Sequence, residues 1–151
     1  MIEIVLPISQ LSSAMAAGAL LVGLIVILPL LLSLPVERYP EINAFVLNRM
    51  DKLMPACTGI AILSGGFIAA ATESRVAQVM FGAGALMLAG VFAVSLIKIA
   101  PINVLVQRID IRNPRPDWQQ LRQRWRNWHY VRVGCGQVGA LLYCLAPAAA
   151  G

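Results

Sequence analysis

The sequence has little charge and a single histidine. Asp, Glu, Lys and Arg make up 13% of its 151 residues and hydrophobic residues 59%, whereas charged residues account for about 25% of an ordinary soluble domain. Residues 4–36 contain no charged residue and no histidine. Since about 20 apolar residues cross the hydrocarbon core of a bilayer as a helix, this run excludes a soluble globular protein. The first basic residue is Arg38, so we do not expect a cleaved signal peptide, which begins with basic residues.

Three further stretches lack charge, at residues 53–72, 76–97 and 133–151, and each is close to the length of a bilayer crossing. The sequence therefore predicts an all-α fold, a single membrane domain over residues 1–151 with four transmembrane helices. Residues 73–75 alone join the second and third helices, so these two must be antiparallel neighbours. The expected spans are residues 11–34, 53–72, 76–99 and 131–149.

Lysine and arginine lie almost entirely in two of the three loops. Every basic residue except Arg75 falls between the first and second helices or between the third and fourth, counting the flanks of the last loop. Loops rich in Lys and Arg stay in the cytoplasm. We therefore expect an integral protein of the inner or plasma membrane with both termini on the non-cytoplasmic side. It contacts membrane lipids and does not bind nucleic acid, because no soluble module remains for that purpose.

Side chains that bind metals are scarce. The chain has one histidine and three cysteines, and the cysteines fall inside predicted helices with no metal-type spacing. This set cannot form a conventional protein-only metal site, and we expect no cofactor. A single axial histidine ligand to a tetrapyrrole is the one arrangement that the sequence leaves open.

The stretch RWRNWHYVR, residues 124–132, holds the only histidine among tryptophans and arginines. At 100° per residue, a helix from residue 117 onward separates into an aromatic face and a face rich in glutamine and arginine. The pattern predicts an amphipathic helix over residues 117–130 at the cytoplasmic surface that runs into the fourth span. The aromatic face consists of Trp118, Leu121, Arg122, Trp125, Trp128, His129, Arg132 and Gly136.

Two interpretations of this face remain open. Tryptophans and arginines can anchor a helix at the lipid headgroups. However, Arg122, His129 and Arg132 interrupt the tryptophans, and polar groups at the membrane boundary, with Gln137 slightly deeper, are candidates for a site. Aromatic walls with guanidinium groups suit a planar aromatic molecule that carries or develops negative charge. His129 would be its general base, although a purely anchoring histidine explains the residue equally well.

The residues around this helix also resemble a known family. The chain has Pro101 and Asn103 at the end of a predicted span, then Arg-x-x-Trp-x3-His-x2-Arg before the last span, and in this it resembles the anthrone oxygenase-like family of small four-helix membrane proteins. The resemblance implies oxidation of an anthrone or similar phenolic or quinol-like substrate by oxygen, without a cofactor. It assigns catalysis to His129, Arg132 and Asn103. His129 would take a proton, and Arg132 and Arg122, with Asn103 donating a hydrogen bond, would stabilise the resulting oxyanion. The residues expected to hold the substrate are Trp125, Arg122, Trp128 and Gln137.

Two alternatives compete with an enzyme. One is a non-enzymatic accessory subunit of a larger membrane complex, or a homo-oligomer, because the small residues of the second and third spans allow close helix contacts. The other is a lipid-binding or quinone-binding protein that uses the same pocket without chemistry. The enzyme hypothesis requires that Asn103 approach His129 and Arg132. If the tryptophans point outward instead, the pocket does not exist.

Overall fold

The computed structural model describes residues 1–150, and of Asp51 and Ala150 only the backbone. All regular elements within this part of the chain are helices, which confirms the all-α prediction. Four helical segments are long and apolar enough to cross a membrane, which confirms the expected number of spans. These segments are Ile2–Ser33, Lys52–Ala71, Arg75–Gln107 and Trp118–Ala149.

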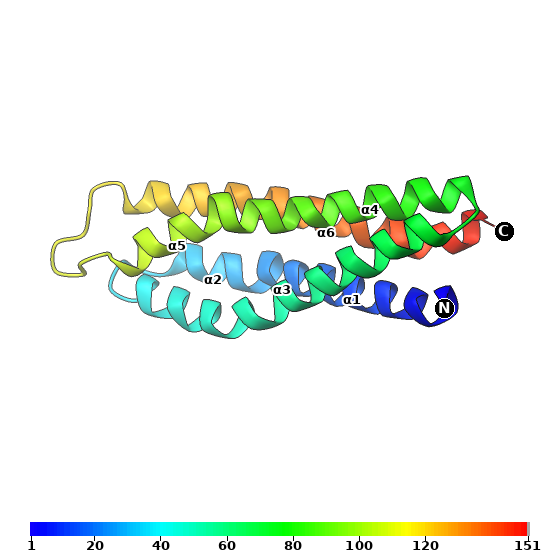
Figure 1. The fold of residues 1–151 in the computed structure, drawn as a ribbon. Coiled ribbons are helices and arrows are strands. Elements are labelled where there is room, and N and C mark those ends of the chain that lie inside the picture. Colours follow the sequence, from blue (N-terminus) through cyan, green and yellow to red (C-terminus); the bar gives the residue numbers. More distant parts are fainter. Residues whose placement is uncertain (151) are drawn as a thin grey trace.

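The first helical column consists of α1 (Ile2–Val22), a π-helical turn (Gly23–Ile27) and α2 (Leu28–Ser33). Pro29 is the second residue of α2. Proline has no N–H to donate and crowds the carbonyl four residues earlier, so the widened turn lies where the regular ladder cannot continue. The column keeps its direction through this turn (Figure 1).

The second and third columns form an antiparallel hairpin. α3 (Tyr39–Ala71) is one continuous helix, and residues 72–74 connect it to α4 (Arg75–Val94). The Ser74 hydroxyl accepts a hydrogen bond from the Ala77 N–H at 3.4 Å and caps α4. A second π-helical turn (Ser95–Ile99) leads into α5 (Ala100–Gln107). The helical path thus extends past the expected end near residue 99, because the π-helical turn accommodates Pro101, which has no N–H to donate to the regular ladder.

The last column is α6 (Trp118–Ala150), a single helix that includes both the surface segment and the fourth span. Residues 108–117 precede it and contain an ion pair between Arg115 and Asp117 at 2.5 Å. This hydrogen-bonded partner lowers the pKa of the Asp117 carboxyl below its usual value. The pair holds the chain in the turn from which α6 begins.

The columns pack in a ring in which each contacts two neighbours: α1 with α3 and α6, and α4 with α3 and α6. Close contacts at glycines hold the end of the ring near the chain termini. Tyr143 of α6 lies against Gly65 and Gly84, and its hydroxyl donates a hydrogen bond to the Ala61 carbonyl at 2.9 Å. A larger residue at either glycine would meet the tyrosine ring.

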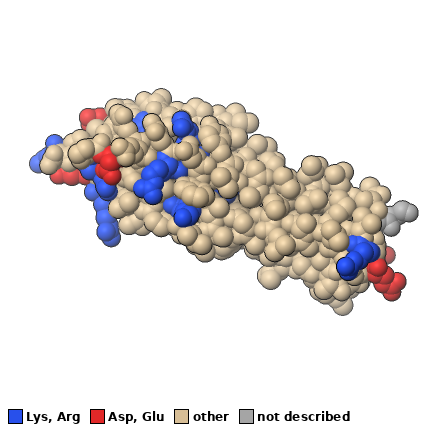
Figure 2. Space-filling view, turned by 90° about the horizontal axis from the view of Figure 1, so that it is seen from above, with Lys and Arg blue, Asp and Glu red and all other residues tan. Residues whose placement is uncertain are grey.

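Charged residues on the surface gather at the two ends of the molecule. Figure 2 shows most Lys and Arg side chains at one end, with a long uncharged surface between them and a small charged group at the other. The 33 residues of α3 extend about 50 Å, whereas the hydrocarbon core is only about 30 Å thick. The basic end of the bundle therefore projects beyond the hydrocarbon, and Lys52 and Lys98 lie at the level where the uncharged surface ends.

Candidate functional site

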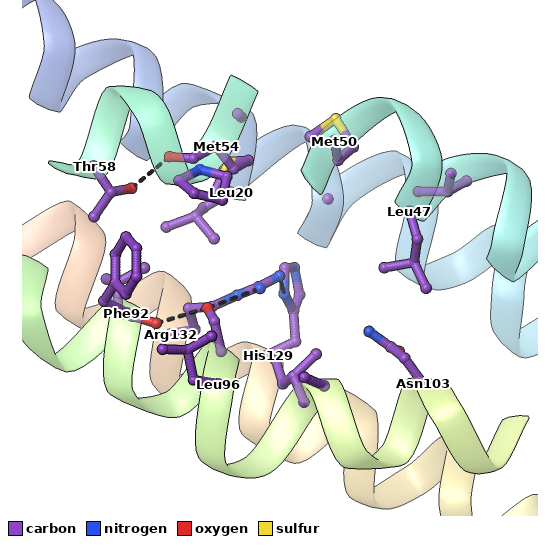
Figure 3. A pocket seen from close by; sticks show the side chains of 18 of the residues that line it. Leu20, Leu47, Met50, Met54, Thr58, Phe92, Leu96, Asn103, His129 and Arg132 are labelled. Carbon is purple, nitrogen blue, oxygen red and sulfur yellow. Dashed lines mark hydrogen bonds between the residues drawn. The ribbon is translucent and has the colours of Figure 1, made fainter. Parts of the chain in front are cut away.

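A cavity of about 310 Å³ lies at the centre of the ring, toward its basic end. All four columns contribute to its wall, and Figure 3 shows the polar side chains of α6 facing the methionines of α3 across it. Its volume is at the lower end of the range for pockets that bind small molecules, about 300–1,000 Å³. The lining residues are Ala19, Leu20, Gly23, Ile27, Val46, Leu47, Met50, Met54, Pro55, Thr58, Val91, Phe92, Ser95, Leu96, Ile99, Ala100, Asn103, Trp125, His129 and Arg132.

Arg132 and His129 form the polar wall of the cavity. They are three positions apart on α6, so they share a helix face. Arg132 Nη2 lies 3.0 Å from His129 Nδ1, and Arg132 Nη1 donates to the Ser95 hydroxyl at 3.2 Å. Because a guanidinium can only donate, Nδ1 must accept, and the imidazole is the neutral tautomer with its proton on Nε2. Ser95 donates in turn to the Val91 carbonyl at 2.7 Å.

The His129 ring is held on one face and along its edge. Its relative exposure is 1%, and it stacks on Trp125 with ring centroids 4.9 Å apart and an interplanar angle of 17°. Nε2 points toward the α1 backbone at Leu20 and Gly23. A Cβ at Gly23 would lie 3.0 Å from ring atoms Cε1 and Nε2. The approach of the imidazole to α1 thus depends on glycine at this position.

Asn103 enters the cavity from α5. Its side chain points into the space between Leu47 and His129 (Figure 3), and its relative exposure is 9%. Asn103 Oδ1 and Trp125 Nε1 are buried and make no hydrogen bond within the part of the chain that the structure describes. Buried polar atoms without partners cost about 1–3 kcal/mol each. A bound molecule with polar groups would remove this cost.

Both π-helical turns lie at the level of the cavity. The first supplies Gly23 and Ile27 to the wall, and the second supplies Ser95, Leu96 and Ile99. A π turn adds one residue to a helical turn and so shifts the following side chains around the axis. The second π turn therefore helps to bring Asn103 of α5 onto the same side of the column as Ser95.

Four of the seven predicted site residues line the cavity, namely Asn103, Trp125, His129 and Arg132. Arg122 lies outside it. Its Nη1 and Nη2 donate to the Leu32 and Leu34 carbonyls at 2.6 and 2.8 Å, and the guanidinium carbon lies 4.4 Å from the ring centroid of Trp118. Arg122 therefore ties α6 to the end of α2, where helical carbonyls lack partners.

Tyr39 completes the surroundings of Arg122, with its ring centroid 4.7 Å from the guanidinium carbon. Burial raises the pKa of the Tyr39 hydroxyl to about 12, and the Arg122 charge opposes this rise. The tyrosine is therefore neutral at physiological pH. This cluster of Arg122, Tyr39 and Trp118 joins three columns at the basic end of the bundle.

Trp128 and Gln137 also lie outside the cavity wall. Trp128 is partly buried, with the Lys98 ammonium 5.1 Å from its ring centroid. Gln137 Nε2 donates to the Ala17 carbonyl at 2.8 Å and ties α6 to α1. All three tryptophans are buried or half-buried, so the aromatic face of α6 is turned into the bundle.

Gly23 and Ser95 are cavity residues that the sequence patterns did not indicate. Each is a small residue within an apolar run, where helix packing is the ordinary explanation. Their importance depends on contacts with His129 and Arg132, which belong to another helix. No three His, Cys, Asp or Glu side chains among the described residues are grouped so that they could hold a metal ion.

A comparison with known families gives a match that covers most of this site. Residues 43–142 match the family described as anthrone oxygenase. This segment includes Asn103, Trp125, His129 and Arg132 and three of the four helical columns. No curated protein and no solved structure matches the chain. Because the family match covers more than half of the chain, the protein belongs to the anthrone oxygenase family.

Proposed function

We propose that the protein oxidises a planar phenolic ketone of the anthrone type with molecular oxygen, without a cofactor, in the central cavity. The observation that carries this proposal is the placement of the buried His129 and Asn103 and the half-buried Arg132 around one cavity with a flat aromatic wall at Trp125. Family membership supports the substrate class. The site residues act on the substrate's proton and charge, and the substrate itself reduces oxygen.

The reaction converts a ring CH₂ group and O₂ into C=O and water. Loss of one proton from the CH₂ group gives an enolate, which passes one electron to O₂. Recombination of the radical with superoxide forms a C–O bond, and protonation gives a hydroperoxide. Loss of the second C–H proton then breaks the O–O bond and releases water. Carbon is oxidised by four electrons and O₂ is reduced by four.

The protein has to promote loss of the first proton from the substrate CH₂ group. In the cavity as it stands, Arg132 Nη2 occupies the lone pair of His129 Nδ1. We propose that the substrate oxygen attracts this guanidinium N–H, which frees Nδ1 to take the proton. The oxyanion then forms beside Arg132 and the Asn103 amide, and His129 later returns the proton to the peroxide.

The energy required is within the reach of these contacts. Lowering the substrate pKa by about 2 units needs about 3 kcal/mol. A guanidinium about 4 Å from the oxyanion contributes about 4 kcal/mol at an effective dielectric constant of about 20. Arg132 alone therefore supplies an interaction of the necessary size, and Asn103 adds a hydrogen bond.

We further propose that the basic end of the bundle is cytoplasmic and that both termini lie on the other side of an inner or plasma membrane. The gathering of Lys and Arg at one end supports this orientation (Figure 2). The first turns of α6, with exposed Gln119, Gln120, Gln123 and Arg124, would then form the cytoplasmic amphipathic surface. The cavity would open at the cytoplasmic membrane boundary.

A second candidate is a quinone-binding protein that uses the same cavity without chemistry. The hydrogen bond from Arg132 to His129 Nδ1 favours it, because the base is already occupied. An accessory or homo-oligomeric role has less support: Gly59, Gly66 and Gly82 leave open space for a Cβ on α3 and α4, which would permit close contact with another helix.

Oxygen consumption by the purified protein with a panel of anthrones separates these functions. We expect wild type to accelerate oxidation, and His129→Ala and Arg132→Ala to lose about 100-fold or more of the rate, as is usual for a positioned acid–base group. Arg124→Ala is the matched control, since Arg124 is exposed on the same helix, and it should retain the wild-type rate. Equal rates for all four proteins would remove the catalytic roles.

A further inference from the structure

Both ends of the cavity are closed by packed side chains. On the side of the basic loops, Leu28, Leu31, Tyr39, Val106 and Leu121 belong to one buried apolar cluster that also includes Trp125. The Arg122 hydrogen bonds to the Leu32 and Leu34 carbonyls hold this end together. On the opposite side, Leu20, Val91 and Val133 form a second buried cluster. A molecule moving along the bundle axis would have to displace one of these clusters.

The exposed part of the lining lies between two columns only. Leu96, Ala100 and Pro55 line the cavity and are also exposed on the outer surface, Leu96 to 61%. They belong to the second π turn, α5 and α3. In contrast, the lining residues of α1 and α6 are buried or half-buried. The cavity therefore opens sideways, between α3 and the α4–α5 column, whose ribbons separate in the middle of the bundle and approach each other again at the end of α5 (Figure 1).

The rim of this opening is apolar. Met50, Met54 and Pro55 form it on α3, and Leu96 and Ala100 on the other column. In the sequence, Lys52 lies between the two methionines and Lys98 lies between Leu96 and Ala100. Both lysines are exposed. Lysines at this position hold their ammonium groups at the headgroups while their stems remain in the apolar layer. The opening thus faces the outer few ångströms of the hydrocarbon rather than water.

We propose that the cavity fills sideways from the bilayer, through the opening between α3 and the α4–α5 column, and that its occupant is a membrane-dissolved planar aromatic molecule with an oxygen group on one edge. The apolar rim admits the ring system edge-on from the lipid. The oxygen group reaches Asn103, His129 and Arg132 on the far wall, where Asn103 Oδ1 makes no hydrogen bond with any of the described residues. This inference rests on the site of the proposed function. It concerns the route into the cavity and the class of molecule that enters, and it does not require that this molecule be oxidised.

Binding of a probe that cannot be oxidised tests this route. We choose 1,8-dihydroxyanthraquinone and follow quenching of tryptophan fluorescence, because Trp125 lines the cavity. With the protein in lipid nanodiscs, the association rate at a fixed aqueous probe concentration should rise with the area of the nanodisc lipid patch, because the lipid collects the probe and delivers it to the opening. An association rate that depends on the aqueous probe concentration alone would overturn the proposal, as would absence of binding to wild type.

Rim variants test the position of the opening. Ala100→Phe should slow probe association about tenfold, because the new ring lies across the opening, whereas Ile97→Phe should leave the rate unchanged, since Ile97 is 66% exposed and does not line the cavity. Leu96→Ala removes side-chain bulk from the rim and should accelerate association, while Leu86→Ala, 72% exposed on α4, should not. Equal rates within both pairs would refute the lateral opening.

The same measurements distinguish this proposal from the proposed function. Probe binding that follows the lipid phase and responds to the rim variants, combined with no oxygen consumption on anthrones, would retain the access route and reject the oxidation. Oxygen consumption by wild type with equal association rates in the rim variants and their controls would retain the oxidation and reject the route.

Discussion

Gly23 is the position at which a single methyl group should disturb the site most selectively. The His129 ring approaches the backbone of the first π-helical turn so closely that a Cβ at Gly23 would lie 3.0 Å from Cε1 and Nε2. In Gly23→Ala the ring must move by a few tenths of an ångström. It cannot move without cost, because Trp125 stacks on its face and Arg132 holds its Nδ1 atom.

The expected effects of Gly23→Ala on stability and on rate have separate causes. Alanine in place of glycine stabilises a helix by about 0.5–1 kcal/mol. The Gly23→Ala variant should therefore be at most slightly less stable than wild type. Misplacement of a catalytic group by about 1 Å costs up to about 100-fold in rate. A smaller displacement of His129 should therefore lower kcat about tenfold, with little change in thermal stability.

Gly18→Ala is the matched control. Gly18 lies on the same helix, and no atom lies within 4 Å of a Cβ built there. Its rate of oxygen consumption should equal that of wild type, and its melting temperature should rise slightly. The assay is oxygen consumption with an anthrone, paired with thermal unfolding in the same detergent. A wild-type rate for Gly23→Ala would refute the role assigned to the close contact between α1 and His129.

Three further predictions concern residues whose roles the structure separates. Arg122→Ala should lower stability by about 3 kcal/mol, because the Leu32 and Leu34 carbonyls lose charged donors, yet it should leave dihydroxyanthraquinone affinity unchanged; a selective loss of affinity would restore its predicted substrate contact. Gly84→Ala should destabilise by about 1–3 kcal/mol, because its Cβ would lie 2.5 Å from Tyr143 Cε1, whereas Gly82→Ala meets no atom within 4 Å and should melt like wild type or higher. Arg132→Lys should lose about tenfold in rate despite its charge, because lysine lacks the planar fork that reaches both Ser95 and His129; a wild-type rate would show that charge alone suffices.

The spans and the inward face of α6 could be predicted because both depend on patterns within one helix. A run without charge fixes where a helix can cross lipid, and the 100° rotation per residue fixes which side chains share a face. The placement of Trp125, His129 and Arg132 on one cavity wall follows from this spacing. Asn103 could be linked to them only through the family resemblance, since nothing in its own helix indicates the partner.

Other features depend on contacts between helices and could not be predicted from spacing. Arg122 shares the face of His129, but its partners are backbone carbonyls at the end of α2, which no side-chain pattern reveals. The helical path continues through Pro101 because a π turn precedes it, and hydropathy does not distinguish such a turn from an ordinary one. Gly23 was indistinguishable from the glycines that only permit packing.

The most direct measurement uses the fact that the protein has one histidine. Nitrogen-15 labelling of histidine gives signals from the His129 ring alone. Without ligand, they should correspond to the neutral tautomer with its proton on Nε2, since Arg132 donates to Nδ1. Saturating dihydroxyanthraquinone should shift the Nδ1 signal as Arg132 turns to the ligand oxygen. An Nδ1–H tautomer, or signals that the ligand leaves unchanged, would contradict the account of the site.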